Sequence, residues 1–274
     1  MALPHQIVAP ASPSRWALVL HGILGSKTNW RGIVRKAAES LPTWGFVLPD
    51  LRNHGDAQAL PPPHDLDAVC DDLAGLREHL GHPFDAVIGH SYGAKSALAW
   101  VDRTHGDLDR AVIVDGNPGL RPDVRGAEST VSAIETLATM GRYFDTREAF
   151  VAGIMAKGFG RDLAQWMAMN LAPDDGRYRL RTDVDAIRAM LDDYFARDLW
   201  HVIEAPPGRV RIDVVIGGTS PALDASERAR VLEAARRAPD RVRCVVIEGA
   251  GHWVHVDKPA ETVQTLIASL SDVG

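Results

Sequence analysis

The stretch DAVIGHSYGAKSALAW (residues 85–100) joins an apolar run to a helical pattern through the sequence Gly-x-Ser-x-Gly. Gly89 and Gly93 stand on either side of Ser91, so the backbone can bend there without side chains colliding with the adjoining strand or helix. This arrangement is typical of a nucleophile elbow, a strained turn that projects the serine hydroxyl above the edge of a sheet. The start of the following helix also stabilises negative charge that develops near the serine. The stretch therefore predicts a strand, a nucleophile and a helix in that order.

The rest of the chain repeats this alternation of strands and helices. The apolar runs are rich in Val, Ile or Leu on both faces, which is typical of strands covered on both sides. The predicted strands are 16–20, 45–49, 85–89, 110–114, 210–216 and 242–247, and the predicted helices are 65–81, 91–104, 224–238 and 258–270. Such alternation predicts an α/β fold, a mostly parallel twisted sheet with helices on both faces.

One region interrupts the alternation. Residues 118–205 contain several helical stretches and no convincing strand pattern. We therefore predict a helical cap at 118–205, inserted into a core domain made of 1–117 and 206–274. Some apolar residues of this region either line an acyl pocket or pack helices together, and packing is the simpler interpretation for each; they are Met155, Trp166, Met167, Met169 and Phe195.

Composition excludes several classes of protein. The chain has 274 residues, 46% hydrophobic and 24% charged, with a net charge of −6, which argues against a nucleic-acid partner. No apolar run is long enough to cross a membrane, and the first residues lack the pattern of a signal peptide. Cys70 and Cys244 lie far apart and predict neither a disulfide framework nor a metal site. These features favour a cytoplasmic location without membrane insertion.

A serine nucleophile needs a base, and His252 is the candidate. The stretch CVVIEGAGHWVHVDKP (244–259) places it just after the last predicted strand, on a glycine-rich loop before the final helix. An imidazole there can reach across the carboxyl ends of the strands. His255, three residues later, is expected to be structural or to lie at the rim of a pocket, and the pair does not make a metal site.

The third requirement is a pair of donors for the developing oxyanion. The stretch VLHGILGSKTNW (19–30) runs from an early strand into an irregular loop. We expect the backbone N–H groups of Ile23 and Tyr92 to converge on the carbonyl oxygen, with Leu24 as the donor if the loop is offset by one residue. His21 is expected to organise the loop.

Four stretches carry a family resemblance: HGILGSKTNW (21–30), DLRNHG (50–55), GHSYGAK (89–95) and GAGHWVHVDKP (249–259). Over essentially its whole length the chain resembles the α/β-hydrolase superfamily, and within it the YbfF-type bacterial esterases and their mitochondrial relatives. The resemblance implies an ester or thioester hydrolase that uses no metal and no organic cofactor. Lys95 matches the family's GHSxGxK, and an ion pair is its expected role. Arg52, Asn53 and His54 are expected to stabilise a turn.

The acid of the triad has two candidates. In most relatives an aspartate follows the strand predicted here at 210–216, but this chain has Thr219, Ser220 and Pro221 there. Asp224 comes later, where capping a helix is its simpler role. Asp115 stands at the end of strand 110–114, next to the strand that carries the serine, and YbfF-type enzymes resemble this arrangement. We therefore predict Asp115, with Asp224 as the alternative.

The predicted catalytic residues are Ser91, Asp115 and His252, and the predicted reaction is acyl transfer through an acyl-enzyme. The predicted partner is a small-molecule carboxylic ester or thioester with a small to medium acyl group. The same residues also suit a C–C bond hydrolase, a perhydrolase or a lyase of the menaquinone type. A non-catalytic ligand receptor on this fold is a further alternative, although such a receptor needs no triad. The sequence does not identify the substrate, which side chains of the cap determine.

Overall fold

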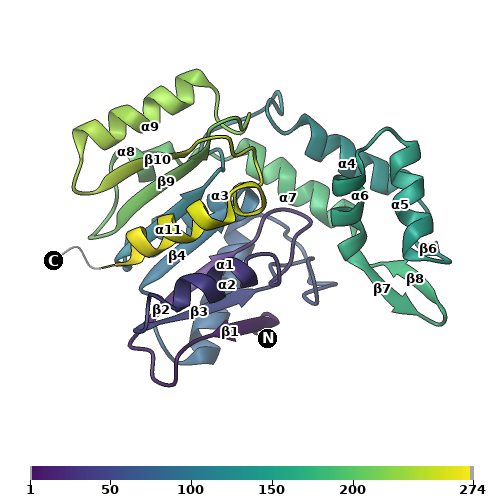
Figure 1. Cartoon of the computed structure of the whole chain (residues 1–274), viewed down its shortest axis with the longest axis horizontal. Coiled ribbons are helices and arrows are strands. Elements are labelled where there is room, and N and C mark those ends of the chain that lie inside the picture. Colours follow the sequence, from purple (N-terminus) through teal and green to yellow (C-terminus); the bar gives the residue numbers. More distant parts are fainter. Residues whose placement is uncertain (1, 272–274) are drawn as a thin grey trace.

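The computed structural model of the chain describes residues 2–271. Within them seven strands form one sheet in the order β1-β3-β2-β4-β5-β9-β10 (Figure 1). Every neighbouring pair is parallel except β1 with β3. The bounds are β1 His5–Val8, β2 Arg15–Leu20, β3 Trp44–Pro49, β4 Ala86–His90, β5 Arg110–Val114, β9 Arg211–Gly217 and β10 Val242–Ile247.

Helices cover both faces of this sheet. On one face lie α1 (Arg31–Ala38) and α11 (Pro259–Leu270), and α11 crosses in front of the strands in Figure 1. On the other face lie α2 (Leu66–Leu80), α3 (Tyr92–Arg103) and α9 (Ala225–Arg237). Successive strand residues alternate between the two cores, as Leu18 and Val19 do. Burial of both faces accounts for the continuous apolar runs, and the predicted mostly parallel sheet is confirmed.

The sequence pattern missed several short elements of the sheet domain, among them β1 and α1. The strand β1 has four residues and pairs antiparallel with β3 at the edge of the sheet. The helix α1 has eight residues and buries Ile33, Val34 and Ala37 against the strands. Both are too short to produce a clear hydrophobic period, which explains why the sequence pattern missed them.

The segment between β5 and β9 is mainly helical, and in Figure 1 most of it stands to one side of the sheet. The prediction that it contains no strand is wrong. Within the described residues it holds a three-stranded antiparallel sheet of β6 (Tyr143–Phe144), β8 (Arg177–Leu180) and β7 (Leu171–Asp174), in that order. Asp175 and Gly176 form the turn between β7 and β8, both with positive φ, of 46° and 76°. An Asp-Gly pair is a strong signal for such a hairpin, and the sequence analysis passed over it.

The remaining helices lie between β5 and β9, except α10, which precedes α11. The helical stretch that begins with α6 ends at Asn170, because the chain enters β7 at Leu171. The bounds are α4 Glu128–Thr139, α5 Arg147–Ala156, α6 Arg161–Met167, a 3₁₀ helix at Ala168–Asn170, α7 Val184–Ala196, α8 Trp200–Glu204 and α10 Val254–Asp257. Of the helices in residues 2–271, none combines the length and the apolar character that crossing a membrane requires.

Candidate active site

Ser91 lies at the junction of β4 and α3, where the chain turns sharply. Its backbone has φ of 56° and ψ of −116°, a conformation that costs a non-glycine residue free energy. A Cβ added at Gly89 would overlap the Gly93 carbonyl, and one added at Gly93 would meet the carbonyl oxygens of Leu20 and His21. Gly89 is therefore required for β4 and α3 to approach as closely as they do, and Gly93 for α3 to approach the end of β2.

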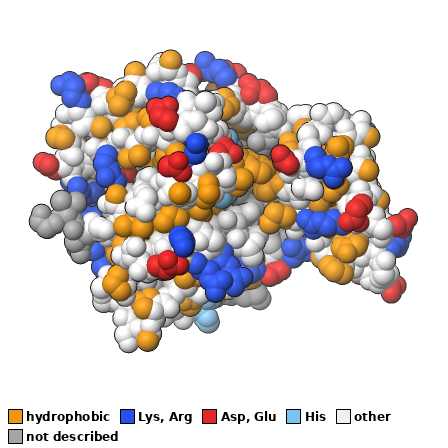
Figure 2. Space-filling view, viewed as in Figure 1, with side chains coloured by type: hydrophobic (Ala, Val, Ile, Leu, Met, Phe, Trp, Pro, Cys, Tyr) orange, Lys and Arg blue, Asp and Glu red, His pale blue; other side chains and the backbone are white. Residues whose placement is uncertain are grey.

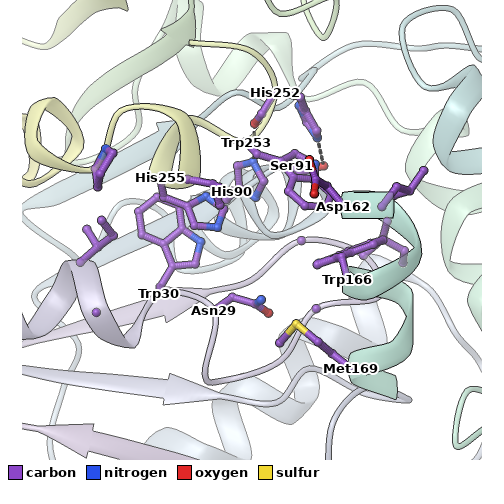
Figure 3. Close-up of a pocket in the computed structure, with 18 of the residues that line it drawn as sticks. Asn29, Trp30, His90, Ser91, Asp162, Trp166, Met169, His252, Trp253 and His255 are labelled. Atoms are coloured by element: carbon purple, nitrogen blue, oxygen red, sulfur yellow. Dashed lines mark hydrogen bonds between the residues drawn. The ribbon is translucent and has the colours of Figure 1, made fainter. Parts of the chain in front are cut away.

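A chain of hydrogen bonds leads away from this serine. His252 Nε2 lies 2.9 Å from Ser91 Oγ, and His252 Nδ1 lies 2.7 Å from Asp115 Oδ2. Figure 3 shows Ser91 and His252 facing one another beside the cavity. The side chain of His252 is 30% exposed whereas that of Asp115 is fully buried. The structure thus brings together three residues that are 24 to 161 positions apart in the sequence, in the order that a catalytic triad requires.

Asp115 has two further partners. Its Oδ1 accepts a hydrogen bond of 2.8 Å from the Gly217 N–H, and its Oδ2 accepts one of 2.5 Å from the Ser220 hydroxyl. Ser220 is buried and occupies the loop after β9, where the acid was expected in most relatives. Sequence analysis did not assign it a role. Its position in that loop is the feature of the sequence that could have pointed to a contact with the acid.

Asp224, the alternative acid, is the N-cap of α9. Its Oδ1 accepts from the Glu227 N–H, and the Glu227 side chain accepts from the Asp224 N–H, which makes a capping box. The Ser226 hydroxyl also bonds Oδ1 and lowers the pKa of Asp224 below its usual range. These hydrogen bonds show that the Asp224 side chain caps the first turn of α9.

The residues of the predicted oxyanion donors lie beside the serine. Ile23 and Tyr92 line a cavity of about 40 Å³ together with Ser91 and His252. Among the described residues, neither the Ile23 N–H nor the Tyr92 N–H has a hydrogen-bond acceptor. The Leu24 N–H, by contrast, donates to His54 Nε2 at 2.9 Å, so Leu24 as the alternative donor is wrong. Two free N–H groups beside a nucleophile can bind an oxyanion.

A much larger cavity, about 1330 Å³ in volume, opens beside Ser91 and His252. Figure 2 shows apolar side chains gathered between the sheet body and the lobe that carries α4 to α6. Trp166 and Met169 line the cavity, and Figure 3 shows both reaching in from the helical segment. Met167 instead packs in the core, and Phe195 lines only the small cavity. Met155 is exposed and lines neither cavity.

Four histidines surround this site, of which His21, His54 and His90 are buried and His255 is half-buried. Burial lowers the pKa of His21 and of His255 to about 4 and that of His54 to about 3, and it also lowers the pKa of His90 well below its ordinary value. His90 Nε2 donates to the His252 carbonyl oxygen at 2.8 Å, and His255 stacks on Trp30 with ring centres 4.7 Å apart. His21 and His255 thus pack against the structure around the site, in the structural roles that the sequence predicted. His90 was not singled out from the sequence.

We expect the free energy of unfolding to fall on acidification. In the folded protein these histidines stay neutral down to about pH 4, whereas in the unfolded chain they bind protons below about pH 6.5. Stability is therefore fully present above pH 6.5 and is lost as the pH falls. One such histidine lowers the free energy of unfolding by about 2 kcal/mol between pH 6.5 and pH 5.

Urea denaturation at pH 7.5 and at pH 5 measures this loss. The variant His255→Phe keeps a ring stacked on Trp30 and removes one titrating group, so its stability should change less between the two pH values. Equal stability of the unsubstituted chain at both pH values would contradict the prediction.

Lys95 does not form the expected ion pair. Its side chain is fully buried, and Nζ donates to the carbonyl oxygens of Gly119, Tyr194 and Arg197 at 2.8, 2.5 and 3.0 Å. Within residues 2–271 no carboxylate lies within ion-pair distance of it. Burial lowers the pKa of Lys95 to about 7. Lys95 therefore joins the elbow helix to both ends of the helical segment.

Hydrogen bonds hold the turn after β3, as expected. His54 Nδ1 donates to the Arg52 carbonyl oxygen, and the Asn53 N–H donates to the Ala57 carbonyl oxygen at 2.7 Å. The Arg52 guanidinium joins this turn to α2 through Asp72 at 2.7 Å. In the part of the chain that the structure describes, no three His, Cys, Asp or Glu side chains are grouped so as to hold a metal ion.

Comparison with known proteins identifies related sequences. A model of the alpha/beta hydrolase family matches residues 17–265. The sn-1-specific diacylglycerol lipase ABHD11 of Mus musculus is 26% identical over 259 residues, which are 92% of this chain and 80% of that protein. Esterase YbfF of Escherichia coli (strain K12) is 26% identical over 256 residues, covering 93% of this chain and 92% of that protein.

Solved structures share the fold. A marine microorganism esterase superposes with a TM-score of 0.82 at 21% identity, covering 98% of this chain and 99% of that one. An E-2-(acetamidomethylene)succinate hydrolase superposes with a TM-score of 0.75 at 20% identity, covering 98% and 94%. At these identities the likeness concerns the fold alone.

Proposed function

This chain belongs to the alpha/beta hydrolase family, and from that membership we propose that it is a serine hydrolase that cleaves carboxylic esters or thioesters through an acyl-enzyme. The observation that carries the proposal is the hydrogen-bonded chain from Ser91 through His252 to Asp115 beside a cavity of about 1330 Å³. The sequence similarity to an esterase and to a diacylglycerol lipase supports the same class of reaction.

Each of the three hydrogen-bonded residues has a role in this mechanism. Ser91 Oγ attacks the carbonyl carbon while His252 Nε2 takes its proton, and Asp115 holds the proton on His252 Nδ1. The N–H groups of Ile23 and Tyr92 stabilise the negative charge on the carbonyl oxygen. His252 then protonates the leaving alcohol or thiol, and later activates the water that releases the acid.

The segment 118–205 acts as a cap over the reacting atoms in this proposal. Side chains of α4 and α6 line the cavity opposite Ser91, and the Trp166 ring lies 5.0 Å from that of Trp253, next to His252. These contacts support the proposal that the segment selects substrates by size and shape.

A fluorophosphonate probe tests the proposal, because it reacts with an activated serine. We expect one adduct, on Ser91, located by peptide mass spectrometry, and a parallel loss of hydrolysis of p-nitrophenyl butyrate. Ser96 and Ser220 are buried and should remain unlabelled. An adduct on another serine with Ser91 unlabelled would refute the proposed nucleophile. Cleavage of a vinylogous diketone without cleavage of aryl esters would instead support a C–C bond hydrolase.

A further inference from the structure

The proposed donor Ile23 lies in a four-residue turn, Gly22 to Gly25. The Gly22 carbonyl oxygen accepts from the Gly25 N–H at 3.0 Å and from His21 Nδ1 at 2.8 Å. A trans peptide directs its N–H opposite to its C=O, so these two bonds also fix the direction of the Ile23 N–H. A Cβ at Gly22 would lie 3.3 Å from Ser91 Cβ, which shows how closely the turn approaches the nucleophile.

Leu24 is the strained member of this turn. Its φ is 57°, a left-handed conformation that is unfavourable for a branched side chain, and its side chain is buried. The surroundings hold it from both sides. Its N–H donates to His54 Nε2 at 2.9 Å, and its carbonyl oxygen accepts from Asn170 Nδ2 at 3.0 Å. A strained conformation persists only where contacts of this kind determine it.

Asn170 is the contribution of segment 118–205 to this turn. It lies in the 3₁₀ helix after α6 and is 6% exposed. Its Nδ2 also faces the Met167 carbonyl oxygen at 3.3 Å, so two acceptors define which end of the amide is the nitrogen. Its own carbonyl oxygen accepts from the Arg181 N–H in the neighbouring hairpin, which anchors Asn170 to the rest of the segment.

We propose that Asn170 is a positioning residue that couples segment 118–205 to the oxyanion donor. By holding the Leu24 carbonyl, it keeps the turn in the conformation that directs the Ile23 N–H at the reacting carbonyl. The donor is then fully in place only while the segment is seated on the sheet domain. This inference rests on the proposed function, because it assigns Asn170 through the oxyanion that Ser91 would generate.

The kinetic consequence follows from where charge develops. An oxyanion forms in the transition state and not in the bound substrate, so a displaced donor lowers kcat and leaves KM nearly unchanged. Removing one oxyanion donor entirely costs about 10² to 10³ in kcat. Asn170→Ala leaves the donor present but unsupported, and we expect a smaller loss of about tenfold in kcat.

The test compares three variants of the full chain on p-nitrophenyl butyrate. Asn170→Ala removes both contacts of the amide. Asn170→Ser is too short to reach Leu24 but can still bond the Met167 carbonyl one turn back, so it isolates the Leu24 contact. Arg181→Ala is the control, because it removes one of the ion pairs between the segment and the core, Arg181 to Asp56 at 2.8 Å, and leaves the hydrogen bonds of the turn in place.

We expect both Asn170 variants to lose about tenfold in kcat, with KM within about twofold, and to bind a trifluoromethyl ketone inhibitor more weakly by the same factor as kcat. Arg181→Ala should keep kcat. Circular dichroism and thermal unfolding establish folding, and Asn170→Ser decides the matter if Asn170→Ala does not fold.

Unchanged kcat in the Asn170 variants, including an effect confined to KM, would overturn the inference. A loss of equal size in Arg181→Ala would overturn it as well. Failure of the proposed function is separate, because it would appear as turnover that persists in Ser91→Ala.

Discussion

Ser91→Ala is expected to lower kcat by about 10⁶-fold, the cost of removing the nucleophile of a serine hydrolase. The methyl group cannot form an acyl-enzyme, so only binding and the oxyanion donors remain to assist attack by water. The substitution leaves the backbone turn and the contacts of Gly89 and Gly93 in place, so folding should be preserved. Hydrolysis of p-nitrophenyl butyrate at saturating substrate measures the loss.

Ser226→Ala is the matched control for this variant. Ser226 is an exposed serine near the start of α9 whose hydroxyl bonds Asp224, and it takes no part in the site. Its kcat should stay within about twofold of the unsubstituted chain, as for surface substitutions generally. A folded Ser91→Ala protein that retains more than a hundredth of the activity would exclude Ser91 as the nucleophile.

Asp115→Asn is expected to lower kcat by about 10⁴-fold. Oδ1 of Asp115 accepts from the Gly217 N–H, so an asparagine should keep its oxygen there and present its NH₂ group to His252 and Ser220. His252 Nδ1 would then have to accept a hydrogen bond, and its proton would move to Nε2, facing Ser91. That tautomer cannot take the serine proton.

The variant Asp224→Asn distinguishes between the two candidates for the acid of the triad. Its carboxylate caps α9, and asparagine caps helices nearly as well, so kcat should stay within about twofold and stability should fall by at most about 1 kcal/mol. Steady-state kinetics and urea denaturation of the two variants decide the question. An inactive Asp224→Asn beside a nearly normal Asp115→Asn would assign the acid to the loop after β9.

Local patterns made much of this molecule predictable. The six predicted strands are present, because a parallel strand covered on both faces gives a continuous apolar run. The exception is β10, which lies at the edge of the sheet and has Arg243 and Val246 exposed. The elbow was predictable because Gly89, Ser91 and Gly93 stand within five residues of one another, in the Gly-x-Ser-x-Gly pattern between an apolar run and a helical pattern. The helical segment was predicted only in part, since the hairpin of β7 and β8 is short and its main signal was the Asp175-Gly176 turn.

The placement of Ser91, Asp115 and His252 followed from strand order, because the carboxyl ends of parallel strands meet at one edge of a sheet. The roles of these residues, and of the Ile23 and Tyr92 donors, stay predictions until the variants are measured. The partners of Asp115 did not follow from strand order. Ser220 has the right chemistry, but nothing in its neighbours shows that its hydroxyl bonds a carboxylate 105 residues earlier.

The sequence by itself thus determined the strands of the sheet, the elbow and the candidates for nucleophile and base, because each of these is marked by residues that lie close together in the sequence. Tertiary structure alone decided what supports them. Lys95 bonds carbonyl oxygens 24 to 102 residues away instead of a carboxylate, and Asn170 reaches Leu24 across 146 residues. Any side chain with an N–H or O–H group can donate to any backbone carbonyl oxygen, so such contacts leave no pattern in the sequence, and only the folded chain selects the partner.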